Sequence, residues 1–346
     1  MNFVRFLLFR GKLGKLLVAA LSGVLACANP GFAVDRDLFI KLSTSVLKVE
    51  AFNPDGSISI GSGVMVAEGA VATNCHVTHR ARRIELIKSG LRWAVQSQSS
   101  NVRHDLCLLY SRHANVPVVA MNSSKLKPGQ AVTAVGFIGG HGPRFSGGQV
   151  KALHDYDKGM VIQSSTPFNS GASGGGLFDE DGRLVGIATF KARRARDDYH
   201  FSLPIQWIID QLEADHAIPV GPLSADEPFW QQKDEQPFFL RALTMEASGN
   251  WKGLLDVSGD WARAEPASAH SWVSIGKAHF HLDQYDAAIA AYRKATAIDA
   301  QDAEAWFQLG LAFADKGENS EVREVHMVLR SIDPDLAEQL ADAALR

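Results

Sequence analysis

The sequence is poor in cysteine, and its N-terminal apolar run is too short for a membrane span. Three cysteines in 346 residues exclude a small disulfide-rich scaffold. The apolar run from Leu16 to Leu25 is well short of the ~20 residues that a transmembrane helix needs. The cysteines and histidines lack metal-ligand spacing, and no glycine-rich phosphate loop precedes a helix. We therefore expect no metal, no cofactor and no transmembrane span in the mature chain.

Basic and small residues flank this apolar run in the pattern of a signal peptide. The first 28 residues hold four basic side chains and no acidic one, and the run is followed by Ala26-Cys27-Ala28. Cleavage there or after Gly31-Phe32-Ala33 fits the pattern, so the signal peptide is predicted over residues 1–33, with an approximate end. Val24 to Cys27 also loosely resembles a lipoprotein box, which leaves lipid attachment at Cys27 open. The mature protein is predicted to be periplasmic or secreted.

Excess basic charge is lacking once the signal peptide is removed. The remaining chain carries 31 Lys and Arg residues against 38 Asp and Glu residues, a net charge of −7. Its two basic clusters, Arg80–Arg83 and Lys191–Arg196, are short. Nucleic-acid binding needs a broad basic face, so a nucleic acid is not an expected partner.

Short β-prone segments alternate with turn residues between residues 37 and 214. Ten segments rich in Val, Ile, Thr and Phe are separated by Gly, Asn and Pro, without helical periodicity between them. Strands this short and this regularly spaced predict an all-β barrel or sandwich. Apolar residues at helical spacing from Ile205 to Glu213 predict a helix that closes this domain. Residues 215–236 contain three prolines and a cluster of acids, and are predicted to be a linker.

Residues 237–346 change to an alanine-rich helical pattern with an internal repeat. Trp272 and Gly276 are matched 34 positions later by Trp306 and Gly310. This pattern resembles the tetratricopeptide (TPR) repeat, which implies binding of a protein or peptide partner, and an unrelated helical bundle is the alternative. The predicted copies lie at about 235–268, which is degraded, and at 269–302 and 303–336, with a capping helix after them.

Ser173 lies in a glycine-rich loop between two β segments. In Gly171-Ala172-Ser173-Gly174-Gly175 the glycines permit a turn that brings the N–H groups of Gly171 and Ser173 together as an oxyanion hole. A glycine-rich serine loop alone is more often just a turn. A serine hydroxyl is not nucleophilic at neutral pH, so it needs a base, and the base needs an orienting acid.

His76 and Asp105 are the candidates for that base and acid. His76 ends a predicted strand, and Asp105 precedes the apolar segment Leu106–Leu109, which would carry its carboxylate into the interior. A buried carboxylate is costly unless it is paired, and the His76 imidazole is the obvious partner. His104 adjoins Asp105 in the chain and would point to the opposite face of a strand. The order His, Asp, Ser, with separations of 29 and 68 residues, is that of a chymotrypsin-type triad.

Cys75 and Cys107 come close together if this triad forms. Cys75 directly precedes His76, and Cys107 follows Asp105 by two residues. A disulfide that braces the site is one interpretation. Two buried free thiols are the other, and the sequence favours them.

Four motifs together resemble the Do-like (HtrA) serine proteases over roughly residues 40–212. This resemblance implies a multidomain protein in which an all-β chymotrypsin-like double barrel precedes the all-α TPR-like repeats. It also implies a serine endopeptidase acting on polypeptides, with the triad between the barrels and the strand Gly186–Phe190 pairing with substrate. The motifs are Gly61-Ser62-Gly63-Val64, Thr73-Asn74-Cys75-His76-Val77, His104-Asp105-Leu106-Cys107-Leu108-Leu109 and Gly171-Ala172-Ser173-Gly174-Gly175.

The chain departs from this family at two points. TPR-like helices stand where the relatives usually have peptide-binding PDZ domains, so the family's rules for activation do not transfer. Ala172 replaces the Asn or Asp commonly found before the serine, which disfavours activation by cleavage.

Substrate preference is predicted from the residues expected near the primary pocket. Pro167 and Phe168 lie there with no acid to recruit Lys or Arg, so we expect a small or medium apolar side chain before the scissile bond. A catalytically silent scaffold and an esterase remain alternatives. The predicted substrate-binding residues are Phe168, Ala188, Thr189 and Phe190.

Overall fold

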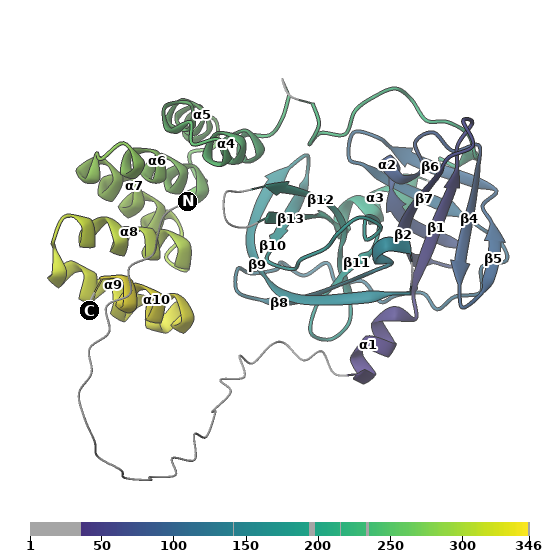
Figure 1. Ribbon diagram of the computed structural model, residues 1–346, viewed down its shortest axis with the longest axis horizontal. Helices are drawn as coiled ribbons and strands as arrows, with labels where there is room; N and C mark the ends of the chain where they lie inside the picture. The colour runs from purple at the N-terminus through teal and green to yellow at the C-terminus, as the bar shows by residue number, and fades with distance from the viewer. Residues whose placement is uncertain (1–35, 141, 194–197, 215, 233–234, 345–346) are drawn as a thin grey trace, which may run out of the picture. The chain divides into compact units, whose positions relative to one another are not determined.

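The computed structural model describes residues 36–346, except 141, 194–197, 215, 233–234 and 345–346 (Figure 1). The predicted signal peptide, Cys27 and part of the basic cluster Lys191–Arg196 lie outside the described residues. Within the described part, no helix has the length and apolar character to cross a membrane.

The first sheet has eight strands in the order β14-β6-β7-β3-β2-β1-β4-β5, paired antiparallel throughout. Its inner face buries Val49, Met65, Val71 and Leu109 completely. Helix α1 (Arg36–Ser43) precedes the sheet, and the short helix α2 (Cys75–Thr78) follows β3 directly. The strands are β1 (Val46–Phe52), β2 (Ile58–Ala67), β3 (Ala70–Asn74), β4 (Arg83–Lys88), β5 (Leu91–Ala94), β6 (Ser97–Asn101), β7 (Leu106–Tyr110) and β14 (Ile218–Pro219).

Six further strands close into a barrel in the order β10-β13-β12-β11-β8-β9. Val150, Ile162 and Leu177 of these strands belong to one buried cluster. Phe178, Phe201 and Leu203 are 0% exposed and belong to another, which they share with residues of β2 and β7. Helix α3 (Ile205–Ala214) follows the last strand, and a 3₁₀ turn spans Ile138–Gly140. The strands are β8 (Ala131–Gly136), β9 (Arg144–Tyr156), β10 (Gly159–Ser164), β11 (Gly176–Phe178), β12 (Leu184–Arg193) and β13 (Asp198–Pro204). The prediction of a double-barrel all-β part is confirmed.

Helices α4 to α10 follow as antiparallel neighbours, drawn from green to yellow in Figure 1. Glycine permits their close approach, because a Cβ on Gly276 would lie 2.4 Å from the ring of Tyr292, and one on Gly310 would lie 2.6 Å from Leu340. The prediction of an all-α repeat part is confirmed. The helices are α4 (Phe238–Ala247), α5 (Trp251–Ala264), α6 (Ala269–His281), α7 (Tyr285–Ile298), α8 (Ala303–Asp315), α9 (Asn319–Ile332) and α10 (Pro334–Ala344).

The predicted linker is attached to the first sheet instead of running free. Ile218 and Pro219 pair with β6, and the Leu223 N–H donates to the carbonyl of His79 at 2.9 Å. Phe229 is 0% exposed, and its N–H donates to the carbonyl of Arg103 at 2.9 Å. We refer to residues 216–232 as the connecting segment.

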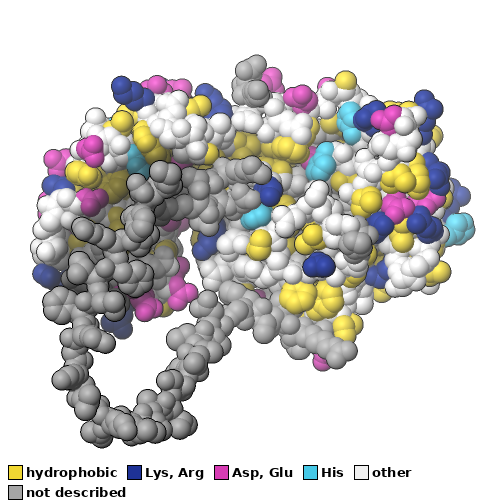
Figure 2. Space-filling view, viewed as in Figure 1, with side chains coloured by type: hydrophobic (Ala, Val, Ile, Leu, Met, Phe, Trp, Pro, Cys, Tyr) yellow, Lys and Arg dark blue, Asp and Glu magenta, His cyan; other side chains and the backbone are white. Residues whose placement is uncertain are grey.

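Charges of both signs alternate around β4 and β5, as Figure 2 shows. Arg83 pairs with Glu85, and Arg92 lies 2.9 Å from Glu50 and 2.7 Å from Glu85. Arg83 and Arg92 therefore belong to a mixed ion-pair network with Glu50 and Glu85.

Candidate active site

His76 and Asp105 meet at the ends of two paired strands. Asn74 at the end of β3 lies opposite Leu106 at the start of β7, so the residues just beyond them are neighbours. Asp105 has a φ of +60°, a left-handed conformation that aspartate tolerates better than most residues. Its carboxylate is thereby directed toward α2, which carries His76.

The buried carboxylate of Asp105 holds the imidazole through two contacts. Asp105 is 1% exposed. Its Oδ1 accepts the backbone N–H of His76 at 2.8 Å, and its Oδ2 lies 2.6 Å from His76 Nδ1. Since a carboxylate only accepts, Nδ1 carries the proton and Nε2 is left as the basic nitrogen. This is the tautomer that a general base for a serine hydroxyl requires.

A disulfide joins Cys75 to Cys107 beside this pair, with 5.0 Å between the two Cα atoms. The interpretation of two free thiols, which the sequence favoured, is therefore wrong. The bond forms because Cys107 lies opposite Thr73 in the β3–β7 ladder, and Thr73 is only two residues before Cys75, the first residue of α2. It links the β3–α2 junction to β7 directly next to the two residues that orient the imidazole.

Hydrogen bonds attach the Ser173 loop to the first sheet. Ser62 donates its N–H to the carbonyl of Ser173 at 2.8 Å and its hydroxyl to the carbonyl of Gly171 at 2.7 Å. The Thr73 hydroxyl donates to the carbonyl of Ser62 at 2.6 Å. Residues of β2 and β3 thus fix the loop that carries the candidate nucleophile.

Ser173 lies beside the turn that carries His76, without a direct hydrogen bond to it among the described residues. Gly61 lies between them: a Cβ there would be 2.7 Å from Val77 and 3.1 Å from the Ser173 carbonyl. The Ser173 hydroxyl is 3.4 Å from the carbonyl of Thr189. Catalytic hydrogen bonds in substrate-free enzymes are often long and shorten in the substrate complex.

The backbone of the Ser173 loop leaves two N–H groups available. The N–H of Ala172 donates to Asn169 and that of Gly175 to Ala172. Gly171 has a φ of +93°, and within the described residues no acceptor is bonded to the N–H of Gly171 or Ser173. Two unpaired N–H groups of one loop can stabilise a developing oxyanion when both point to it.

Phe168, one of the predicted substrate-binding residues, belongs to a small buried apolar cluster. It is 4% exposed and packs with Ala172 and Ala188, and its ring centroid lies 4.8 Å from that of His200.

Two of the predicted substrate-binding residues, Thr189 and Phe190, have structural contacts. The Thr189 hydroxyl accepts from Asn74 at 2.9 Å and donates to Ile187 at 2.8 Å, which ties β12 to the end of β3. Phe190 stacks between Phe201 and Trp230, at 4.7 and 5.1 Å between ring centroids.

Trp230 of the connecting segment contacts the His76–Asp105 pair, and the sequence interpretation missed it. Its indole N–H donates to Asp105 Oδ2 at 3.2 Å, and its ring lies edge-on to His76 at 5.9 Å between centroids. The signal in the sequence was an adjacent aromatic pair, Phe229-Trp230, within a stretch otherwise rich in proline and acids.

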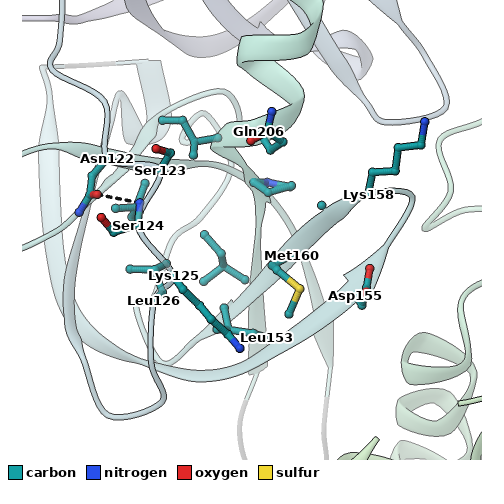
Figure 3. A pocket seen from close by; sticks show the side chains of 15 residues that line it. Asn122, Ser123, Ser124, Lys125, Leu126, Leu153, Asp155, Lys158, Met160 and Gln206 are labelled. Atoms are coloured by element: carbon teal, nitrogen blue, oxygen red, sulfur yellow. Dashed lines mark hydrogen bonds between the residues drawn. The ribbon is translucent and has the colours of Figure 1, made fainter. Parts of the chain in front are cut away.

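A separate cavity of about 360 Å³ is lined by none of the predicted site residues. Figure 3 shows Leu126, Leu153 and Met160 along its apolar side and Lys125 and Lys158 among its polar residues. The triad candidates are therefore not part of this cavity.

Family comparisons agree with the two-part architecture. Residues 61–187 match the model of the trypsin-like peptidase domain, and residues 276–317 match that of the TPR repeat. The chain is thus similar to a trypsin-like peptidase domain in its first part and to TPR repeats in its second. The region matched to the peptidase model contains His76, Asp105 and Ser173, while the connecting segment with Trp230 lies beyond it.

Relatives of the peptidase domain are named as serine endoproteases. The chain is 34% identical over 169 residues to a probable periplasmic serine endoprotease DegP-like of Marinomonas sp. (strain MWYL1), covering 45% of this chain and 36% of the relative. It is 31% identical over 140 residues to the periplasmic pH-dependent serine endoprotease DegQ of Escherichia coli (strain K12), covering 38% and 31%. The chain thus spans about a third of the length of these relatives.

A solved structure supports the fold. The active form of the Rv3671c protease from M. tuberculosis superposes with a TM-score of 0.51 at 19% identity, covering 56% of this chain and 89% of that one.

Proposed function

We propose that the protein is a serine endopeptidase of the HtrA type, with His76, Asp105 and Ser173 as its catalytic triad. One observation carries the proposal: the buried Asp105 carboxylate lies 2.6 Å from His76 Nδ1, while hydrogen bonds from β2 hold the Ser173 loop beside the same turn. The names of the relatives support the activity.

The mechanism follows from these positions. Ser173 Oγ attacks the substrate carbonyl carbon, and His76 Nε2 takes the hydroxyl proton while Asp105 stabilises the imidazolium. The N–H groups of Gly171 and Ser173 bind the resulting oxyanion. His76 then gives the proton to the leaving amine, and a water molecule activated by His76 hydrolyses the acyl-enzyme. No cofactor takes part in these steps.

The substrate is an exported or unfolded polypeptide, with a small or medium apolar residue before the scissile bond. Phe168, Ala172 and Ala188 support this preference because they fill the pocket region with apolar atoms. The TPR repeats bind a protein or peptide, or regulate the peptidase domain. The periplasmic relatives and the predicted signal peptide support a periplasmic or secreted location.

The proposal is tested by incubating the mature chain with unfolded casein, beside Ser173→Ala. We expect cleavage by the wild type and a loss of about 10³-fold or more in the variant, because the nucleophile is removed. A fluorophosphonate probe should label the wild type at Ser173. Absence of both cleavage and labelling would favour the silent scaffold, and turnover of a short ester without casein cleavage would favour an esterase.

A further inference from the structure

The Asp105 carboxylate has a second side-chain donor, and that donor comes from outside the matched peptidase region. Oδ2 lies 2.6 Å from His76 Nδ1 and 3.2 Å from Trp230 Nε1. With Oδ1 accepting the His76 backbone N–H, these three donors account for the orientation of a carboxylate that is 1% exposed. A buried carboxylate that loses a donor is destabilised or rotates toward another one.

Two polar side chains close to Asp105, Asn74 at the end of β3 and Thr189 of β12, have other hydrogen-bond partners. The Asn74 amide donates to the Asp105 backbone carbonyl at 3.1 Å and to Thr189 at 2.9 Å. The Thr189 hydroxyl donates to Ile187 at 2.8 Å. The indole of Trp230 therefore supplies to Oδ2 a hydrogen bond that neither of these groups provides.

Trp230 is held in place by the residue before it and by its own backbone. Phe229 is 0% exposed and packs against Tyr156 at 4.8 Å between ring centroids. The N–H of Phe229 donates to the carbonyl of Arg103, two residues before Asp105, and the Gln236 amide donates to the Trp230 carbonyl at 2.7 Å. The segment is thus fixed to the same loop that carries Asp105.

The ring of Trp230 also packs against two other rings, those of Phe190 and His76. It stacks on Phe190 with centroids 5.1 Å apart and an interplanar angle of 13°, and its plane is turned 86° from that of His76. This packing fixes the direction in which the indole N–H points. A freely rotating side chain on the surface would have no such fixed direction.

We propose that Trp230 is a positioning residue for the triad: its indole N–H orients the Asp105 carboxylate and, through it, the His76 imidazole. The inference rests on the proposed endopeptidase function. It places part of the catalytic apparatus in the segment that leads from the peptidase domain into the TPR repeats.

The test compares the full-length wild type with Trp230→Phe, which keeps an aromatic ring on Phe190 and removes the N–H. We expect kcat for a peptide substrate to fall about tenfold, the effect of losing one hydrogen bond to a charged group, with KM within about twofold. Trp261→Phe is the matched control, since Trp261 Nε1 also donates to a carboxylate, that of Glu265 at 2.8 Å. Its kcat should equal that of the wild type.

A second variant separates positioning from packing. Benzothienylalanine at position 230 keeps the bicyclic ring and lacks the N–H, so it should reproduce the loss of kcat at an unchanged melting temperature. Wild-type kcat in this variant would overturn the proposal. A raised KM at unchanged kcat would also overturn it, because the ring would then only form a wall of the substrate site.

A measurement that does not need activity distinguishes failure of this inference from failure of the proposed function. In Ser173→Ala, the downfield NMR signal of the His76 Nδ1 proton should shift or disappear when Trp230→Phe is added. An unmoved signal contradicts the inference. If the wild type has no peptidase activity and the signal still moves, the endopeptidase proposal fails while the contact from Trp230 to the His–Asp pair stands.

Discussion

Gly174 combines two constraints at one residue of the serine loop. Its φ is +84°, and a Cβ there would lie 2.1 Å from the Ser62 carbonyl oxygen and 2.3 Å from the Thr73 hydroxyl. Both atoms belong to the hydrogen-bond chain that fixes the loop. Any side chain must therefore push the loop away from β2 and β3.

We predict that Gly174→Ala lowers kcat/KM at least about 100-fold, because displacements of about 1 Å have effects of this size. Gly56→Ala is the matched control: its φ is +82° and nothing lies within 4 Å of its Cβ. It should cost only the backbone strain, about 1–2 kcal/mol, and keep full activity. Peptide hydrolysis measures the activity of the two variants, and thermal melting measures their stability. Equal activity of Gly174→Ala and Gly56→Ala would show that the close contact at Gly174 is not important.

Phe168 is the residue that we expect to limit the size of the proposed primary pocket. It packs on Ala172 and Ala188 next to Ser173, so a shorter side chain opens space beside the nucleophile. We predict that Phe168→Leu changes the preference for the residue before the scissile bond. The kcat/KM for substrates with a larger apolar residue there should rise about tenfold relative to the kcat/KM for substrates with alanine. Mass spectrometry of casein fragments measures the preference.

Phe201→Leu is the control for that experiment, because Phe201 is also completely buried in the closed barrel but belongs to another cluster. It should lower stability and leave the cleavage preference unchanged. The same shift in both variants would mean that general loosening of the barrel, and not pocket size, sets the preference.

Individual elements show which parts of the fold the sequence could predict. β7 is read directly from its apolar run, and α6 and α8 from the 34-residue repeat, since burial and packing leave regular patterns. β6 was missed because Ser97–Asn101 is entirely polar, a composition of low strand propensity. It forms a strand because it pairs with β7 and β14, and such long-range pairing leaves no local signal.

The candidate site also has a part that the sequence could predict and a part that it could not. The chain order of His76, Asp105 and Ser173 and the apolar strand after the acid were sufficient to propose their roles. The Cys75–Cys107 disulfide depends on the register of β3 and β7, and the contact of Trp230 depends on how the connecting segment is attached. The spacing of the cysteines therefore left the disulfide as one of two interpretations, and it gave no indication of the contact from Trp230.

The disulfide connects β3 and α2 to β7 across a separation of 32 residues. We predict that the double variant Cys75→Ala, Cys107→Ala loses about 2–4 kcal/mol of unfolding free energy, since the cross-link restricts the unfolded chain. Denaturant titration measures the change. A reductant should destabilise the wild type by a similar amount and leave the double variant unchanged. Equal stability of reduced and oxidised wild type would contradict the prediction.

The helix pair α6–α7 depends on Gly276. A Cβ there would lie 2.4 Å from the ring of Tyr292, which is 0% exposed. We predict that Gly276→Ala destabilises the repeats by about 1–3 kcal/mol, the usual cost of overpacking. Gly259→Ala is the control, because the nearest atom to its Cβ is Arg263 Nη1 at 3.7 Å. It should be stabilising by up to about 1 kcal/mol, since alanine favours the helix. A higher melting temperature in both variants would contradict the packing argument.

On the scale of the whole molecule, the closed barrel and the first helices share one apolar cluster. Phe201 and Leu203 of β13 belong to the same cluster as Phe239 and Leu240 of α4. His154 of β9 stacks on Phe239 with ring centroids 4.2 Å apart and lies 5.3 Å from the ring of His270 on α6. A group that can become charged is therefore buried where the two parts of the chain touch.

Burial, together with the smaller effect of the neighbouring His270, lowers the pKa of His154 from 6.5 to about 3, although the hydrogen bond to Gln163 opposes the shift. Above pH 6.5 this residue is neutral in the folded and unfolded chains, so its contribution to stability does not change. As the pH falls below 6.5, the unfolded chain binds a proton that the folded chain excludes, and stability falls by about 1.4 kcal/mol per pH unit until about pH 3.

We predict that the wild type loses about 2 kcal/mol of unfolding free energy from His154 between pH 7 and pH 5. Denaturant titrations at these pH values measure the loss. In His154→Gln the loss of unfolding free energy between pH 7 and pH 5 should be smaller by about 2 kcal/mol. His113 is exposed, so His113→Gln should behave as the wild type. An identical loss in His154→Gln would contradict the prediction, because the loss of stability in acid would then come from other groups.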